Sequence, residues 1–117
     1  GPCRSAASEV EDLQTRYGDD IVYLTLLVED VSRKNPNVAD AKAWADAFGI
    51  ESAPVLAGSR DFMSASPQSG WPVTSFPSFF IINKEMIYVR EETGFRRGKI
   101  EDIILEMLAE EQDTGGA

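Results

Sequence analysis

The residues best suited to chemistry are a lone cysteine near the start of the chain and a proline that precedes an apolar run. Cys3 follows Gly1-Pro2 and is the only cysteine among the 117 residues. Pro77 stands before Phe79-Phe80-Ile81-Ile82, a run that predicts a buried strand. Because proline cannot donate to a strand ladder, Pro77 is either a plain strand-start proline or a cis-proline, and the sequence leaves both open.

The composition excludes several kinds of chemistry. The chain has no histidine, so it cannot build a Ser-His-Asp triad, a Cys-His pair or a histidine-ligated metal site by itself. One cysteine allows neither an intrachain disulfide nor a cysteine-rich zinc site, so redox chemistry must pass through Cys3. The net charge of −9 repels a phosphate backbone. We therefore expect no metal, no cofactor and no nucleic-acid partner.

The elements that position Cys3 start with a helix over residues 2–17. Apolar residues recur there at spacings of three and four, Pro2 suits a first helical turn, and Gly18 follows as a stop. Cys3 then lies in the first turn, near the positive end of the helix dipole, where a thiolate is favoured. Without further context, a lone cysteine is equally well explained as a small buried apolar residue.

Residues 21–28 are nearly continuous in apolar side chains, which is typical of a strand covered on both faces. This strand ends at Glu29-Asp30, two carboxylates that could tune a thiol but are more often loop and capping residues. A helix over 38–48, with Gly49 as its stop, separates it from a short edge strand at 53–57. A crossover of this length implies that the two strands are parallel neighbours.

The segment 51–73 is the least regular part of the chain. Its Phe62, Met63 and Trp71 could line a substrate groove, although packing onto the core is the simpler explanation. Beyond it, the apolar runs 79–82 and 86–89 are joined by Asn83-Lys84-Glu85, a connection short enough to predict an antiparallel hairpin. An apolar stripe from Ile100 to Leu108 predicts a last helix.

Two motifs in this order resemble the thioredoxin-like superfamily, in particular the TlpA/ResA-like thiol-disulfide oxidoreductases. Gly1-Pro2-Cys3-Arg4 is similar to the end of that group's Trp-Cys-Gly-Pro-Cys-Arg motif. Ser75-Phe76-Pro77-Ser78-Phe79-Phe80-Ile81-Ile82 is similar to its Val-Pro-Thr-Thr-Phe-Leu-Ile-Asp segment, whose proline is cis. The resemblance covers residues 1 to about 110 in the order of the elements. It implies an α/β, thioredoxin-like fold with a mixed central sheet flanked by helices.

The resemblance also implies an activity and a set of site residues. Cys3 matches the second, more buried cysteine of a redox-active Cys-Gly-Pro-Cys motif that exchanges disulfides with a protein substrate. Pro77, in the cis form, would leave a backbone edge at Phe76 to which a substrate peptide could pair. Pro2, Ser75, Phe76 and Pro77 are therefore the expected substrate-binding residues, and the partner is a protein thiol or disulfide.

One departure from the family pattern is serious. The first cysteine of the motif would stand directly before Gly1, and so would a strand that the family places inside the sheet; the chain contains neither. We expect that the chain lacks part of the natural protein, with a cloning remnant at Gly1-Pro2 as the rival explanation. On this view residues 1–110 are an N-terminally incomplete domain and 111–117 a flexible tail. A membrane anchor would have to lie upstream.

Two other functions stay open. A thioredoxin-fold binding module without redox turnover would result if the residue before Gly1 were not a cysteine. A peroxiredoxin-like peroxidase is related in fold, although its Pro-x-x-x-Thr-x-x-Cys pattern is not in this chain. The resemblance favours the oxidoreductase, with a periplasmic or other extracytoplasmic location in a bacterium and the cytoplasm as the alternative.

Overall fold

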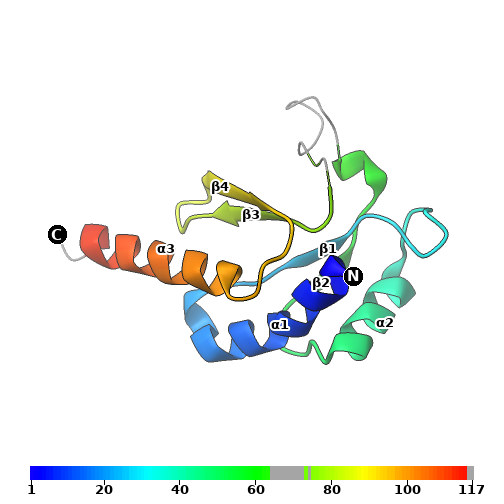
Figure 1. Ribbon diagram of the computed structural model, residues 1–117, viewed down its shortest axis with the longest axis horizontal. Helices are drawn as coiled ribbons and strands as arrows, with labels where there is room; N and C mark the ends of the chain where they lie inside the picture. Colours follow the sequence, from blue (N-terminus) through cyan, green and yellow to red (C-terminus); the bar gives the residue numbers. More distant parts are fainter. Residues whose placement is uncertain (64–72, 74, 116–117) are drawn as a thin grey trace. The chain divides into compact units, whose positions relative to one another are not determined.

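Three helices and two small sheets, one parallel and one antiparallel, make up the computed structural model of the chain, which describes residues 1–63, 73 and 75–115 (Figure 1). The elements follow one another as α1 (Pro2–Tyr17), η1 (Gly18–Asp20), β1 (Thr25–Leu27), α2 (Val38–Phe48), β2 (Val55–Ala57), η2 (Arg60–Phe62), β3 (Ser78–Ile82), β4 (Tyr88–Thr93) and α3 (Lys99–Gly115). The protein is thus of mixed α/β class, as the sequence predicts.

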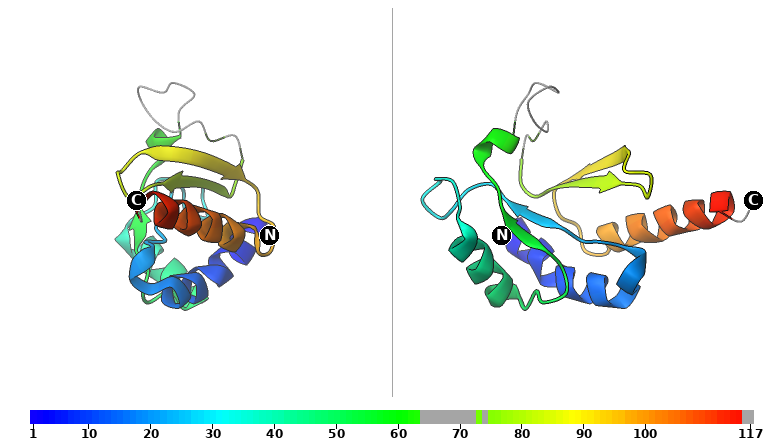
Figure 2. Two further views of the ribbon diagram at one scale, coloured as in Figure 1. Left: turned by 90° about the vertical axis from the view of Figure 1, so that its left-hand side faces the viewer. Right: turned by 180° about the vertical axis from the view of Figure 1, so that it is seen from behind.

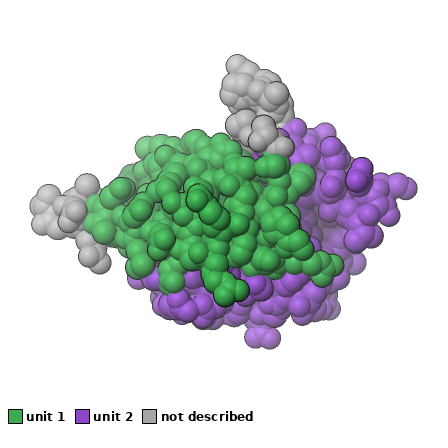
Figure 3. Space-filling model, in the orientation of Figure 1, with its two compact units in different colours: residues 1–6, 75–117 green, residues 7–74 purple. Residues whose placement is uncertain are grey.

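The described residues belong to two compact units (Figure 3). Residues 7–74 form one of them, which is continuous in the sequence, and residues 1–6 together with 75–117 form the other. The boundary falls inside α1, after Ala6. The chain therefore consists of two units, whereas the sequence predicted one domain over 1–110 followed by a tail.

The continuous unit contains the β1–α2–β2 crossover that the sequence predicts. β1 and β2 lie side by side and are parallel, with Leu26 opposite Leu56 (Figure 2). Helix α2 begins at Asn37, whose side chain accepts a hydrogen bond from the Asp40 N–H while the Asp40 carboxylate accepts one from the Asn37 N–H, a complete capping box. It ends at Gly49, which adopts a left-handed conformation.

The strand predicted over residues 21–28 is much shorter in the structure, because a side chain occupies the backbone groups of its first half. Gln14 of α1 is buried, with 8% of its surface exposed. Its Oε1 accepts a hydrogen bond from the Tyr23 N–H at 2.7 Å, and its Nε2 donates to the Ile21 carbonyl at 2.9 Å and to the Gly18 carbonyl at 3.2 Å. Only Thr25–Leu27 remain as a strand.

The discontinuous unit contains the antiparallel hairpin β3–β4 and the helix α3. The hairpin is predicted correctly, but its second strand runs from Tyr88 to Thr93, two residues later than expected, and a bulge lies between Ile81 and Ile82. Met86 adopts φ 65 in the connecting turn and is therefore no strand residue. The Arg90 guanidinium donates to the Glu106 carboxylate at 2.7 Å, which ties β4 to α3.

Helix α3 continues through Gly115, beyond residue 110, where the sequence places the start of a tail. Ile100 and Ile103 are its buried residues, in line with the predicted apolar stripe, whereas Leu105 is half exposed. In α1 the residues at helical spacing, Ala6, Val10 and Leu13, are all buried, as expected.

Candidate functional site

Cys3 lies in the first turn of α1, where the sequence places it. It is a free thiol and partly buried. Burial raises the pKa of this thiol, and the nearby positive amino group of Gly1 opposes the effect without reversing it. The expectation that the helix start favours a thiolate is therefore wrong in direction, because desolvation of the sulfur outweighs the favourable charges around it. Pro2, the first residue of the same turn, is exposed.

The segment Ser75–Pro77 leads into β3. The Phe76–Pro77 peptide bond is cis, one of the two geometries that the sequence leaves open. The Ser78 hydroxyl donates to the Ser75 carbonyl at 2.7 Å, and the Gly94 N–H donates to the Pro77 carbonyl at 2.8 Å. The segment is thus held in place on both sides of Phe76.

Phe76 itself keeps its backbone groups open. Among the residues that the structure describes, neither its N–H nor its carbonyl has a hydrogen-bond partner. Its side chain is 43% exposed. The arrangement offers one donor and one acceptor of an extended backbone, the groups with which a peptide strand would pair.

The structure brings the two motifs into one unit. Cys3 and Pro2 belong to the stretch 1–6, and Ser75, Phe76 and Pro77 belong to 75–117; together these stretches form the discontinuous unit (Figure 3). More than seventy positions of sequence separate them, yet they group with each other and not with residues 7–74. Four of the expected substrate-binding residues and the thiol are therefore parts of one body.

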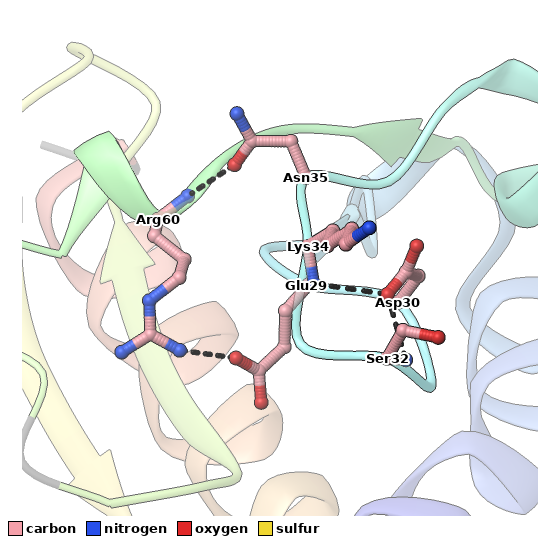
Figure 4. A network of polar contacts seen from close by, with 6 residues as sticks. All are labelled: Glu29, Asp30, Ser32, Lys34, Asn35 and Arg60. Carbon is pink, nitrogen blue, oxygen red and sulfur yellow. Dashed lines mark hydrogen bonds and ion pairs between the residues drawn. The ribbon is translucent and has the colours of Figure 1, made fainter.

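The two carboxylates after β1 belong to the other unit, where both have local partners (Figure 4). Glu29 forms an ion pair with Arg60, and the Asn35 side chain accepts a hydrogen bond from the Arg60 N–H at 3.3 Å. The Asp30 carboxylate accepts hydrogen bonds from the N–H groups of Ser32 at 2.8 Å and Lys34 at 2.9 Å. Asp30 thus caps a loop, and thiol tuning by Glu29 and Asp30 stays a prediction.

The Arg60–Glu29 pair was not foreseen from the sequence. Its two residues are 31 positions apart and belong to no motif, so no local pattern could have paired them. Of the three apolar residues proposed for a groove in 51–73, Phe62 is 46% exposed and Met63 is partly buried. Trp71 lies outside the described residues.

The search for metal and membrane features adds little to this site. Within residues 1–63, 73 and 75–115, no cluster of three or more histidine, cysteine, aspartate or glutamate side chains could hold a metal ion. None of the described helices combines the length and the hydrophobicity that crossing a membrane requires.

Comparison with known proteins gives no relative. No protein-family model, no curated protein and no solved structure matches this chain.

Proposed function

We propose that this chain carries the second half of the redox motif of a thiol-disulfide oxidoreductase with a thioredoxin-like fold, of the TlpA/ResA-like kind, which acts on protein disulfides. The observation that supports the proposal best is the grouping of Cys3 with Ser75, Phe76 and Pro77 in one unit. The resemblance pairs these two motifs as thiol and substrate-binding segment, and a chance likeness of either one gives no reason for them to meet.

In the proposed reaction, a cysteine directly before Gly1 attacks a substrate disulfide, forms a mixed disulfide and releases one substrate thiolate. The Cys3 thiolate then attacks the sulfur of that cysteine, closes the Cys-Gly-Pro-Cys disulfide and releases the second substrate thiolate. The substrate gains two electrons and the protein loses two. A thiol whose pKa is raised by burial suits Cys3 for the second step, because it stays protonated and unreactive until the mixed disulfide forms.

Substrate binding is proposed at Phe76. A peptide on either side of the scissile disulfide would accept from the Phe76 N–H and donate to its carbonyl, which adds a short strand before β3. The exposed ring of Phe76 would cover the apolar side chains of the bound peptide. Sequence recognition beyond this would be weak, since the contacts are mostly to the backbone.

The test restores the missing sulfur. One version of the chain receives a cysteine directly before Gly1, and the control receives a serine at the same place. With dithiothreitol as electron source, the cysteine version is expected to accelerate the reduction of insulin disulfides over the serine version. Replacing Phe76 with proline, which removes its N–H, should lower this rate. Equal rates for the cysteine and serine versions would refute the proposal.

A binding module without redox turnover is the second candidate, and the raised pKa of Cys3 favours it. A buried, protonated thiol is a poor nucleophile, and the chain itself contains no second sulfur for a dithiol cycle. Glutathione disulfide separates the two candidates. A reactive Cys3 exchanges with it, gains one glutathionyl group and releases one glutathione thiolate, which intact mass spectrometry detects at pH 8.

A further inference from the structure

The strand β1 has the side chains of an interior strand but only one neighbour. A parallel sheet is normally covered on both faces and is therefore almost continuously apolar, as residues 21–28 are. In the structure β1 pairs with β2 on one side, and the two strands make up the whole of their sheet among the described residues. The sequence and the position of this strand thus disagree.

The backbone groups on the free side of β1 can be identified from the printed ladder. The Thr25 N–H donates to the Pro54 carbonyl at 2.9 Å, and the Leu27 carbonyl accepts from the Gly58 N–H at 2.7 Å. Thr25 and Leu27 therefore face β2. Because successive residues of an extended strand direct their backbone groups to opposite sides, those of Leu24 and Leu26 face away from it.

These outward groups are open. In the described part of the chain, no hydrogen bond is made by the N–H or the carbonyl of Leu24 or of Leu26. The side chains along the same stretch are exposed to an unusual degree for their size: Val22 by 75%, Leu24 by 51% and Leu26 by 37%, with Leu56 on β2 at 45%. Unpaired backbone next to exposed apolar side chains marks a strand edge without the usual protection, since it has no charge, proline or bulge.

We propose that the free edge of β1 at Leu24 and Leu26 binds an extended peptide strand of another molecule, with alternating apolar side chains and basic flanks. Alternating outward donors and acceptors select an extended backbone, because no other ligand satisfies both at strand spacing. Val22, Leu24 and Leu26 select apolar side chains on one face. The net charge of −9 favours a basic partner and opposes pairing with a second copy of the chain. The proposal does not involve Cys3 and is independent of the redox function.

The probe is the synthetic peptide Ac-Lys-Val-Thr-Val-Thr-Val-Lys-NH2. Two derivatives serve as matched controls: one is N-methylated at the valines and the other at the threonines. Each methylation removes the donors along one edge of the peptide and leaves every side chain in place. Only one of the two edges can face β1, so one derivative should bind like the parent peptide and the other should lose binding.

Amide hydrogen exchange of the unmodified protein, read by NMR, gives the site. Without peptide, the amides of Leu24 and Leu26 are expected to exchange freely while that of Thr25 is protected. Saturating parent peptide should slow the Leu26 amide by about tenfold, the effect of gaining one hydrogen bond. The same shifts should appear in Cys3→Ser, which separates this result from any failure of the redox proposal.

Three results would overturn the inference. The first is equal binding of both methylated derivatives, since adsorption to an apolar surface does not depend on backbone donors. The second is no binding of the parent peptide. The third is protection of the Leu26 amide before peptide is added, either in a monomer or in a dimer detected by sedimentation, because the edge would then already be covered.

Discussion

Gln14→Met is expected to lower the free energy of unfolding by about 2 kcal/mol. Methionine matches glutamine in length and in helix propensity, so α1 and the volume of the site are retained. What is lost is a set of three hydrogen bonds, to Gly18, Ile21 and Tyr23. Gly18 is exposed, so water replaces its partner at little cost.

The Ile21 carbonyl and the Tyr23 N–H are only partly exposed, and each would be left unpaired at about 1–1.5 kcal/mol, below the full cost of a buried group. Burial of the methionine side chain returns part of this loss, which leaves about 2 kcal/mol. Urea unfolding, followed by circular dichroism and by the fluorescence of Trp44 in the same unit, measures the difference.

Gln14→Glu is the matched second variant, because it is isosteric and keeps an acceptor for the Tyr23 N–H. At pH 7 the new carboxylate would face the carbonyls of Gly18 and Ile21, so we expect a larger loss than with methionine. Burial and the two carbonyls raise the pKa of this carboxyl in the folded state. The loss is therefore complete above that folded pKa and shrinks as the pH falls toward the unfolded value, where the protonated group can donate to Ile21. If Gln14→Met unfolds within about 0.5 kcal/mol of the wild type, the argument from unpaired backbone groups is refuted.

Three further predictions concern other parts of the chain. Met86 adopts φ 65 and is 81% exposed, so Met86→Gly should relieve the conformation without losing burial and raise stability by about 1 kcal/mol, whereas Met86→Ala should not; equal urea midpoints for the two variants would contradict this. Hydrogen bonds from the Ser52 and Glu51 N–H groups lower the pKa of Glu11. Its contribution to stability is thus present above the unfolded pKa and lost as the pH falls through the folded one, so the gap in urea midpoint between wild type and Glu11→Gln should close on acidification; a gap that does not depend on pH would count against these bonds. Finally, the alkylation rate of Cys3 by iodoacetamide should reach half its maximum at a higher pH than that of a free cysteine in a peptide, because burial raises its pKa; a lower midpoint would show that the helix start dominates.

Local patterns predicted much of the fold. The bounds of α1 and α2 follow from helical spacing, from Pro2 at the first turn and from the glycine after each helix, and both were predicted to the residue. The parallel pairing of β1 with β2 follows from the length of the crossover. These features depend on neighbours in the sequence, which a reader of the sequence has in hand.

What the sequence did not predict depends on distant partners. The strand at 21–28 has the right apolar pattern, but a side chain from α1 takes up its first backbone groups, and nothing in the pattern announces that Gln14 turns inward. The second strand of the hairpin was placed too early because Met86 looks like a strand residue, yet the turn needs a residue with positive φ there. The direction of the pKa of Cys3 required the burial of its sulfur, which composition and spacing do not contain.

The division of the chain into a continuous and a discontinuous unit has a consequence for its synthesis. A ribosome makes residues 1–6 first and residues 75–117 last, with the whole of the other unit in between. The crossover β1–α2–β2 uses only contacts that are close in sequence and can form while the chain is still being made. The turn that carries Cys3 must wait for its partners until the hairpin emerges, so during translation its thiol stays available to oxidants and to other nascent chains.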